Sequence, residues 1–586
     1  MSKAPQGKNL RPELRIFIAS ALSIIVILLW AKFFAPKPPV QKPQSSNPTA
    51  TSPATAGTQS SSNTSSGVSS SNPAPAPTVS SGPAAPALSD KSERTIVVES
   101  NLYRVEFSNR GGVVKSWKLK KYMDDAKPRQ VLDLVHAKTS EETGGWPFAV
   151  ALDDENLESA ANSALFVSSA SGNLTAPADV SFSWSNGHLQ VTKRFHFDEG
   201  YTVKAEVTAK YDGKPVVAGL AWLGGFGDLT ITDPRPVETV NIVFNENGKT
   251  TALPHKKVDD WDKVARGIWL GGKDWTGIED RYFAAIFMAE SGAAPGKLET
   301  RYWKVWHPVQ IDGKDTPEPI TQIVTATSPA TDLRIYVGPK DYDVLKKMSP
   351  PLHSLVNFGW LEFIADPLFH GMKWLQKYIP NWGWAIVVMT LVINMLLFPL
   401  RISSYKTTLK MQRVAPEIKS IQERYKKYSM RDPRKAEMNK EVMAVYAREG
   451  INPVGGCFQM LVQMPIWIGL NTALRSAIEL RHAPWFGWIR DLSSKDPYYI
   501  LPFIMAVSMY LATKMTPMTT TDPQQQAMMK FMPLSFAVMF IVFPISSGLA
   551  VYILTSSLVG IVQQWYLNRR HPVTPANGKP AKTKKS

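Results

Sequence analysis

The 586-residue sequence predicts a polytopic α-helical membrane protein with six transmembrane helices and a large antiparallel β-sandwich domain outside the membrane. Three observations lead to this prediction. Apolar runs, most of them near the length that a helix needs to cross a bilayer, occur close to the start and throughout the last third of the chain. Between them, Thr95 to Pro339 alternates apolar and polar residues over short stretches, as half-buried strands do. Basic residues gather beside the apolar runs and orient them.

The charge is strongly positive, with 66 basic against 49 acidic residues and a net charge of +17. Because the basic residues lie beside long apolar runs, they indicate membrane topology and contact with anionic lipids or a ribosome, and we expect no nucleic-acid substrate. One cysteine, Cys457, allows neither an intrachain disulfide nor a cysteine-based zinc site. The 9 histidines form no HxxxH or HExxH pattern. We therefore expect no metal site and no cofactor.

The first apolar run, Ile16 to Phe34, follows a tail, residues 1–15, that carries four basic residues. This flank predicts a cytoplasmic tail and a transmembrane anchor at 16–34. A cleaved signal peptide is the alternative, but no good small-x-small cleavage site follows the run. Residues 35–90 are rich in Ser, Pro and Ala and hold few large apolar side chains, so we expect a disordered linker on the outer side.

Residues 91–345 are expected to form the β-sandwich, because runs such as TIVVESNLYRVEFSN and YTVKAEVTAKY alternate and are separated by turn residues. Adjacent carboxylates in this region are candidates for paired catalytic acids, or they are simply solvated loop residues. They are Asp153, Asp154, Glu155, Glu279 and Asp280. Since adjacent loop carboxylates are usually solvated, we expect no catalytic residue here and no enzyme.

Residues 346–380 mix large apolar side chains with charges too frequent for a membrane span. An amphipathic helix on the outer membrane surface, with a break near Pro367, is the prediction. A buried helix of a soluble domain is the alternative.

Residues 381–568 hold the five remaining apolar segments. These are Trp382–Leu400, Pro453–Leu474, Tyr498–Thr513, Met528–Phe543 and Leu549–Leu567. Residues 401–450 between the first two contain 13 basic and 6 acidic residues and fit a cytoplasmic helical hairpin. The tail, residues 569–586, has 6 basic and no acidic residues. The distribution of charge thus predicts that both termini lie in the cytoplasm and that the β-sandwich lies outside.

Polar residues recur at helical spacing inside the apolar segments. Thr390, Asn394 and Arg401 fall on one stripe of a continuous helix, and Gln459 and Gln463 share a face of the next span. Such residues are either hydrogen-bonding contacts between helices or the lining of a shared hydrophilic cavity. The spans contain no acidic residue at mid-membrane depth, which argues against an ion-coupled transporter. The pattern favours a membrane device that is not an enzyme.

Several motifs resemble the YidC/Oxa/Alb family of membrane protein insertases. They are NPVGGCFQMLVQMPIWIGL at 452–470, ELRHAPWFGWIRDLSSKDPYYILP at 479–502, KMTPMTTTDPQQQAMMKFMP at 514–533, IVQQW at 561–565, NRGGVVKSWKL at 109–119, VGPKDYDVL at 337–345 and FIADPLFHGMKWL at 363–375. They extend from the β-rich region to the last span, so the resemblance covers the whole architecture. The linker and much of the β-rich region add little to it.

The resemblance implies a protein of the bacterial inner membrane that inserts and folds nascent membrane proteins, alone or beside the Sec translocon. The β-sandwich is then periplasmic, the ribosome and anionic lipids are further partners, and five core helices enclose a hydrophilic groove open to cytoplasm and lipid. The groove residues that we expect, from the polar pattern together with the resemblance, are Thr390, Asn394, Arg401, Gln459, Gln463, Tyr552 and Ser556. An apolar slide for the substrate is implied at Met460, Met464, Ile468, Met529, Met532 and Phe536.

The sequence departs from the family at Asn394, where relatives commonly place the groove arginine. We hypothesise that Arg401 supplies the charge at the mouth of the groove; the alternative is a basic residue that merely extends to the membrane surface. Tyr552 is kept, while Ile553 replaces a second tyrosine. A transporter or lipid-handling protein that uses the same cavity remains the alternative function, and a sugar-binding or mutarotase activity of the outer domain is a third.

Overall fold

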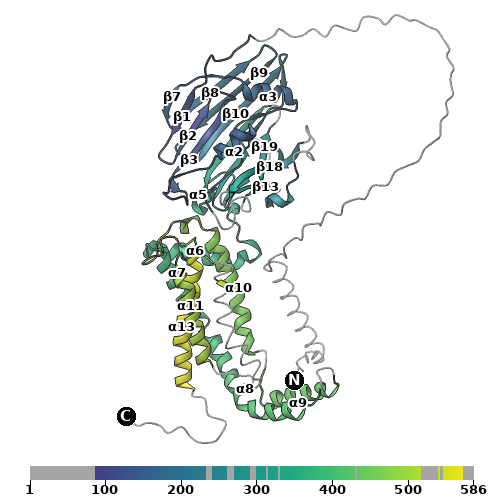
Figure 1. The fold of residues 1–586 in the computed structure, drawn as a ribbon, viewed down its shortest axis with the longest axis vertical. Coiled ribbons are helices and arrows are strands. Elements are labelled where there is room, and N and C mark those ends of the chain that lie inside the picture. Colours follow the sequence, from purple (N-terminus) through teal and green to yellow (C-terminus); the bar gives the residue numbers. More distant parts are fainter. Residues whose placement is uncertain are drawn as a thin grey trace, which may run out of the picture. The chain divides into compact units, whose positions relative to one another are not determined.

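The structure of the chain is a computed structural model (Figure 1). It describes residues 86–231, 240–260, 269–290, 298–311, 314–327, 330–428, 432–452, 455–516, 539–540 and 545–571. The predicted anchor at 16–34, most of the linker, part of the slide and most of the basic tail lie outside these residues.

Residues 95–339 form a β-rich domain, as the alternating pattern predicts. Its strands are β1 (Thr95–Glu99), β2 (Tyr103–Ser108), β3 (Val113–Met123), β4 (Val131–Asp133), β5 (Val150–Ala151), β6 (Val167–Ser168), β7 (Gly172–Thr175), β8 (Ala178–Ser185), β9 (Leu189–Phe197), β10 (Thr202–Tyr211), β11 (Lys214–Val216), β12 (Gly219–Trp222), β13 (Asn241–Glu246), β14 (Lys249–Pro254), β15 (Leu270–Lys273), β16 (Trp275–Glu279), β17 (Phe283–Ala289), β18 (Leu298–Ile311), β19 (Lys314–Ala326) and β20 (Thr331–Pro339). Two short helices, α2 (Ala137–Thr143) and α3 (Glu155–Ser163), lie between strands.

The described strands make three sheets. A 10-stranded sheet has the order β14-β13-β16-β17-β20-β10-β9-β8-β6, with β11 paired to β10 off this path. Two 5-stranded sheets have the orders β4-β3-β2-β1-β7 and β15-β18-β19-β12-β5. Pairing is antiparallel except between β1 and β7, where Ile96 lies opposite Gly172. The purely antiparallel prediction is wrong at this edge, because the long connection between β1 and β7 allows the chain to return in the same direction.

Aromatic side chains fill the core between the sheets. Phe107, Phe148, Trp117 and Trp222 are fully buried, and Phe148 stacks on Phe195 with ring centroids 5.3 Å apart. Every second residue is buried along β9 and most of β10, whereas β12, β16 and most of β17 are buried on both faces, so period two predicts only part of the core.

Two of the candidate acids are buried, which corrects the expectation that they are solvated. Asp280 accepts hydrogen bonds from the backbone N–H groups of Tyr282 and Phe283, and Glu279 pairs with Lys340 at 3.0 Å. Asp154 caps α3 by accepting from two backbone N–H groups. Each carboxylate thus has a structural partner that satisfies it.

The remaining described chain is mainly helical. Its helices are α5 (Tyr342–Lys346), α6 (Glu362–Tyr378), α7 (Trp382–Leu396), α8 (Phe398–Arg424), α9 (Arg434–Arg448), α10 (Gly455–Ser476), α11 (Ile500–Met515) and α13 (Ser547–Arg570). Helix α13 packs against α7 and α11, and α10 packs against α6 and α8 (Figure 1). Helices α8 and α9 form the expected hairpin, with a small apolar core of their own.

Among the described residues, α13 is long and apolar enough to cross a membrane by itself. Helices α7 and α8 meet the same test as a bent pair, with 53° between them, and α11 is a shorter apolar helix. The six predicted crossings include the anchor and a segment at 528–543 that fall largely outside the described residues, so six crossings stay a prediction.

Helix α6 has the two faces that the amphipathic prediction requires. Phe363 and Trp374 are exposed, whereas Ala365, Phe369 and Met372 are buried. The predicted break near Pro367 is wrong, since one helix runs from Glu362 to Tyr378. Proline removes one N–H donor, but the bonds around it keep the helix continuous.

Candidate functional site

The polar residues of α7 and α8 lie on two helices rather than on one. Helix α7 ends at Leu396 and α8 begins at Phe398, with Pro399 in the first turn of α8. Proline has no N–H to continue the ladder of the preceding helix and is well tolerated in a first turn, so the chain bends here. The prediction of one stripe through Thr390, Asn394 and Arg401 is therefore wrong, because the periodicity is interrupted between the last two.

Asn394 is buried on α7, and its amide has partners on two helices. Its Nδ2 donates to the carbonyl of Thr390 at 2.8 Å and lies 3.4 Å from Ser556 Oγ on α13. Thr390 is fully buried and donates its hydroxyl to the carbonyl of Ile386. The amide is thus held between helices by weak contacts to α13 that another hydrogen-bonding group can replace.

Arg401 is half-buried at the start of α8 and is held by α13. One guanidinium nitrogen, Nη1, donates to Gln563 Oε1, and Nη2 donates to the carbonyl of Gly560, both at 3.1 Å. The Nε2 of Gln563 in turn donates to the carbonyl of Asn394 at 3.2 Å. Gln563 therefore joins the two residues that the helix break separates.

Helix α13 presents one polar face to its neighbours. Tyr552, Ser556, Gly560 and Gln563 follow each other at spacings of four, four and three residues, which places them on one side of the helix. Helix α10 also contacts this face, because Nε2 of Gln463 donates to the Tyr552 hydroxyl at 2.9 Å. The structure thus brings six of the predicted residues and Gln563 together at this face of α13. We call these seven residues the polar cluster; they are Thr390, Asn394, Arg401, Gln463, Tyr552, Ser556 and Gln563.

Gln563 and Gly560 are the members of this site that the reasoning from sequence did not single out. The signal was available, because Ser556 and Gln563 lie seven residues apart and therefore share a helix face. Gln563 was not selected because it lies near the end of the last apolar run, where polar residues are common.

The predicted slide is described only in part. Met464 and Ile468 are half-buried on α10, on successive turns of one face. The side chains of Gln459 and Met460, and the whole of Met529, Met532 and Phe536, lie outside what the structure describes. The proposed groove and slide at these positions remain predictions.

The chemistry of the polar cluster is that of binding rather than of proton transfer. It offers one cation, three side-chain amides and three hydroxyls, and helices α7, α10, α11 and α13 contain no Asp or Glu. Amides and hydroxyls hydrogen-bond the peptide groups of another chain, and a guanidinium attracts carboxylates. The arrangement suits a polar polypeptide segment.

Comparison with known proteins gives a family for nearly the whole chain. Residues 95–371 match the family described as YidC periplasmic domain, and residues 374–574 match the family described as 60Kd inner membrane protein. A protein of Geobacter metallireducens named membrane protein insertase YidC is 33% identical over 568 residues, which are 95% of this chain and 98% of the relative. The protein of that name from Cupriavidus necator is 31% identical and covers 90% of this chain and 92% of its own.

A crystal structure described as an active YidC insertase with its first transmembrane domain resolved is also similar. It is 18% identical, covers 82% of this chain and 95% of its own, and gives a TM-score of 0.35. The two YidC relatives share about a third of their residues with this chain over almost all of its length, which shows the family of the chain. The chain belongs to the YidC family of membrane protein insertases.

Proposed function

We propose that this protein inserts and folds nascent membrane proteins in the bacterial inner membrane, using the polar cluster to hold the hydrophilic segment of a substrate. The observation that carries the proposal is the placement of Arg401, which α13 holds beside buried Asn394. A positive charge and an amide at this junction can bind a polar tail while the adjoining apolar segment enters the lipid. A membrane chaperone role follows from the same contacts.

The wider architecture is part of the proposal. Six helices cross the membrane, both termini are cytoplasmic, and five helices form a groove open to cytoplasm and lipid. The basic hairpin of α8 and α9 receives chains from the ribosome, and anionic lipids contact the basic segments. Insertion proceeds alone or beside the Sec translocon. Support comes from the charge distribution, the hairpin and the family to which the chain belongs.

The two residues have different tasks in this scheme. Two charges 4 Å apart interact by about 4 kcal/mol at an effective dielectric constant of about 20, so Arg401 attracts an acidic tail toward the membrane. Asn394 carries no charge and exchanges hydrogen bonds with whatever polar group replaces Ser556. Met464 and Ile468 on α10 then offer an apolar surface to the segment that enters the bilayer.

The test is complementation in cells depleted of their own insertase, with expression of the variants matched first. Insertion is followed for a single-spanning substrate with an acidic translocated tail and for the same substrate with a neutral tail. We expect Arg401→Ala to lower insertion of the acidic tail about tenfold, equivalent to about 1.4 kcal/mol, and to affect the neutral tail much less. Adding Asn394→Arg to Arg401→Ala restores the charge in the groove and should restore insertion.

Lys410→Ala is the matched control, because it removes one positive charge from an exposed position of the same helix. Arg401→Lys separates charge from geometry, since lysine keeps the charge but cannot bond Gln563 and Gly560 in the same fork. The proposal fails if Arg401→Ala inserts both substrates as well as the parent protein, or if Lys410→Ala is equally impaired.

A further inference from the structure

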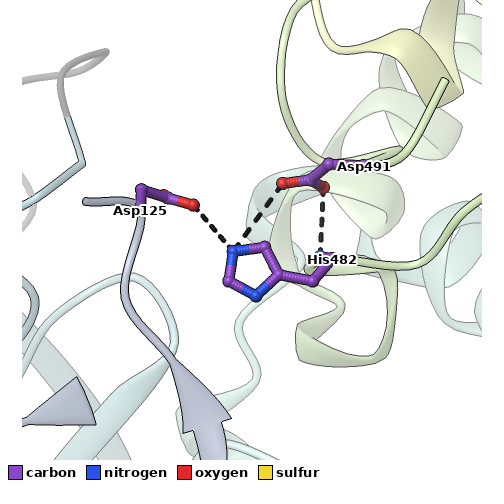
Figure 2. A group of neighbouring side chains, drawn as sticks. All are labelled: Asp125, His482 and Asp491. Carbon is purple, nitrogen blue, oxygen red and sulfur yellow. Dashed lines mark hydrogen bonds and ion pairs between the residues drawn. The ribbon is translucent and has the colours of Figure 1, made fainter. Parts of the chain in front are cut away.

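Three side chains with metal-binding atoms meet where the β-rich domain contacts the segment between α10 and α11. Asp125 follows strand β3, while His482 and Asp491 belong to the connecting segment (Figure 2). The Nε2 atom of His482 lies 2.7 Å from Asp125 Oδ1 and 4.0 Å from Asp491 Oδ2. The ligand atoms of the three residues all lie within 4.8 Å of one another.

Asp491 is held in place by its own segment. Its Oδ1 accepts from the backbone N–H of His482 and of Ser493 and from the Ser493 hydroxyl, and its Oδ2 accepts from the Ser494 hydroxyl. Carboxylates that ligate metals are usually fixed in this way by a second set of hydrogen bonds. The Asp491 side chain is therefore already ordered before a cation binds, so binding costs little conformational entropy at this residue.

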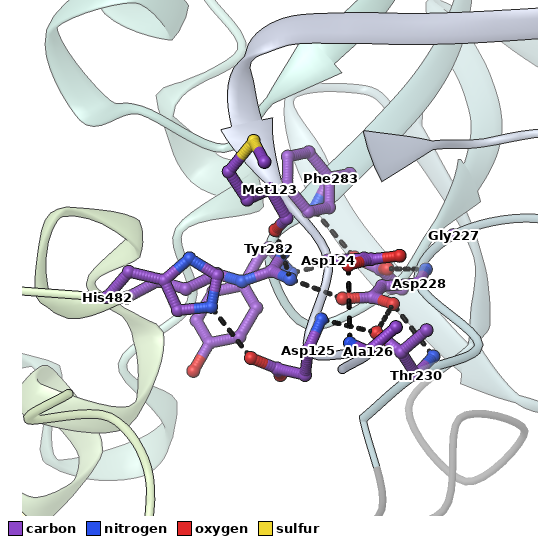
Figure 3. A network of polar contacts seen from close by, with 12 residues as sticks. Met123, Asp124, Asp125, Ala126, Gly227, Asp228, Thr230, Tyr282, Phe283 and His482 are labelled. Atoms are coloured by element: carbon purple, nitrogen blue, oxygen red, sulfur yellow. Dashed lines mark hydrogen bonds and ion pairs between the residues drawn. The ribbon is translucent and has the colours of Figure 1, made fainter. Parts of the chain in front are cut away.

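Asp125 is positioned by the β-rich domain. Its backbone N–H donates to Thr230 Oγ1 at 2.7 Å, and the Thr230 hydroxyl donates to Asp228 (Figure 3). Asp228 also forms an ion pair with Arg481. The side chain of Arg481 is 3% exposed and that of Asp228 is 1% exposed. Arg481 is thus paired with Asp228, which leaves the carboxylates of Asp125 and Asp491 facing one imidazole.

The chemistry of the cluster fits a cation site. It holds two carboxyl groups and one imidazole. This is a combination of oxygen and nitrogen ligands that suits a divalent first-row metal.

We propose that Asp125, His482 and Asp491 bind a divalent transition-metal cation, with Zn²⁺ as the best fit, and that this cation fastens the β-rich domain to the segment between α10 and α11. Zinc bonds of about 2.0–2.2 Å at tetrahedral angles separate ligand atoms by about 3.3 Å. The two separations from His482 Nε2, 2.7 and 4.0 Å, bracket this value, and all the ligand atoms lie within 4.8 Å of one another, so shifts of about 1–2 Å bring them to one cation. The cation takes the place of the proton between His482 and Asp125, and water supplies a fourth ligand.

His482 also lines a neighbouring cavity of about 350 Å³. The proposal is independent of the insertion mechanism, since none of the three residues belongs to the polar cluster.

The experiment titrates the purified full chain, without a polyhistidine tag and after chelation, with Zn²⁺ in a calorimeter and with Co²⁺ in a spectrophotometer. We expect one equivalent of Zn²⁺ to bind and Co²⁺ to give the visible bands of a low-coordinate site. Asp125→Asn and His482→Asn should each weaken binding at least tenfold. Asparagine is chosen at position 482 because it tolerates the positive φ of 58° found there.

The control is His196→Asn. His196 pairs with Asp179 at 2.8 Å as His482 pairs with Asp125, and no second carboxylate completes a described cluster there. Binding that survives in His196→Asn and is lost in both variants of the cluster supports the proposal. No binding by the parent chain at 100-fold excess of Zn²⁺ overturns it, as does equal binding by the parent and both cluster variants, and the three residues are then a hydrogen-bonded contact alone.

Discussion

Arg401 approaches helix α13 closely because residue 560 has no side chain. A Cβ at Gly560 would lie 3.2 Å from Nη1 of Arg401, a tight contact, and 3.4 Å from Nη2, so the guanidinium would have to shift by a few tenths of an ångström even for alanine. A larger side chain at position 560 would fill the space that the guanidinium occupies. The position of the charge in the polar cluster therefore depends on a residue that has no polar side chain.

We predict that Gly560→Leu displaces Arg401 and lowers insertion of an acidic-tailed substrate about as much as Arg401→Ala does. The double variant should be no worse than either single variant, because both remove one interaction. Insertion assays on the four proteins of this cycle measure the coupling. Losses that add independently would show that Gly560 serves helix packing instead.

Lys193 is a buried cation in the β-rich domain. Its Nζ lies 2.7 Å from the carbonyl oxygens of both Gly111 and Phe148, and burial lowers its pKa to about 7. The unfolded value is about 10.4, so between about pH 7 and pH 10.4 the unfolded chain binds a proton that the folded chain does not. The stability contributed by this group therefore rises with pH through that window and is constant below it.

We predict that hydrogen exchange in strands β9 and β10 of the full chain slows from pH 7 to pH 9.5 after correction for intrinsic rates. Lys193→Met should abolish that pH dependence, whereas Lys204→Met, at an exposed position of β10, should keep it. A pH dependence that is unchanged in Lys193→Met would mean that other groups cause it.

At the scale of elements, the α8–α9 hairpin is held by a small apolar core and by exposed ion pairs. The core contains Val414, Ile418, Ile421, Val445 and Ile451. The ion pair between Arg448 and Glu417 measures 2.7 Å, but its side chains are 60% and 41% exposed. Exposed pairs contribute less than about 1 kcal/mol, whereas a buried isoleucine contributes several times more.

We predict that Ile418→Ala destabilises the hairpin by about 2–5 kcal/mol and Arg448→Ala by less than about 1 kcal/mol. Hydrogen exchange of α8 and α9 in the full chain measures both changes. Similar losses for the two variants would show that ion pairs, rather than the core, hold the hairpin.

Elements with a clear period were predictable, and the breaks between them were not. The periodicity predicts two hairpin helices at about Lys406–Tyr428 and Pro433–Arg448, and the structure has Phe398–Arg424 and Arg434–Arg448. The bend at Leu397 was missed because hydropathy is continuous through it, and Pro399 was taken as part of the span. The parallel pairing of β1 with β7 depends on contacts between distant residues, which periodicity does not report.

At the scale of the whole molecule, Arg481 and Asp228 connect the helical part to the β-rich domain. Both side chains are buried, and Nη2 of Arg481 also donates to the carbonyl of Met123. The guanidinium lies over the rings of Tyr282 and Phe283, 5.5 and 5.4 Å from their centroids. Removing one partner of such a pair leaves a buried charge without compensation.

We predict that Asp228→Ala weakens this contact by about 3–5 kcal/mol and that adding Arg481→Met recovers part of the loss. Hydrogen exchange at residues 123–126 in the full chain reports how often the contact opens. An exchange rate that Asp228→Ala leaves unchanged would show that the domains are held together elsewhere.

The sequence predicted the family, the β-rich domain and most members of the polar cluster, but it gave no sign of the cluster of Asp125, His482 and Asp491. Asp125 and His482 are more than 350 positions apart, so no local motif connects them. Asn394 was found because it interrupts an apolar run at helical spacing from Thr390, and Ser556 because it is one of three consecutive polar residues in the last span. Gln563 required the structure, since its role depends on the break between α7 and α8.

The central claim is that the polar cluster holds the hydrophilic segment of a substrate during insertion. A photo-crosslinking residue placed at Ser556, and in a second protein at Val562, tests it on ribosome-bound nascent chains. Both positions are on α13, but Val562 is 63% exposed on the outside of the helices. The account predicts that the hydrophilic tail crosslinks to position 556 and not to position 562, whereas equal crosslinking at both, or none at position 556, would contradict it.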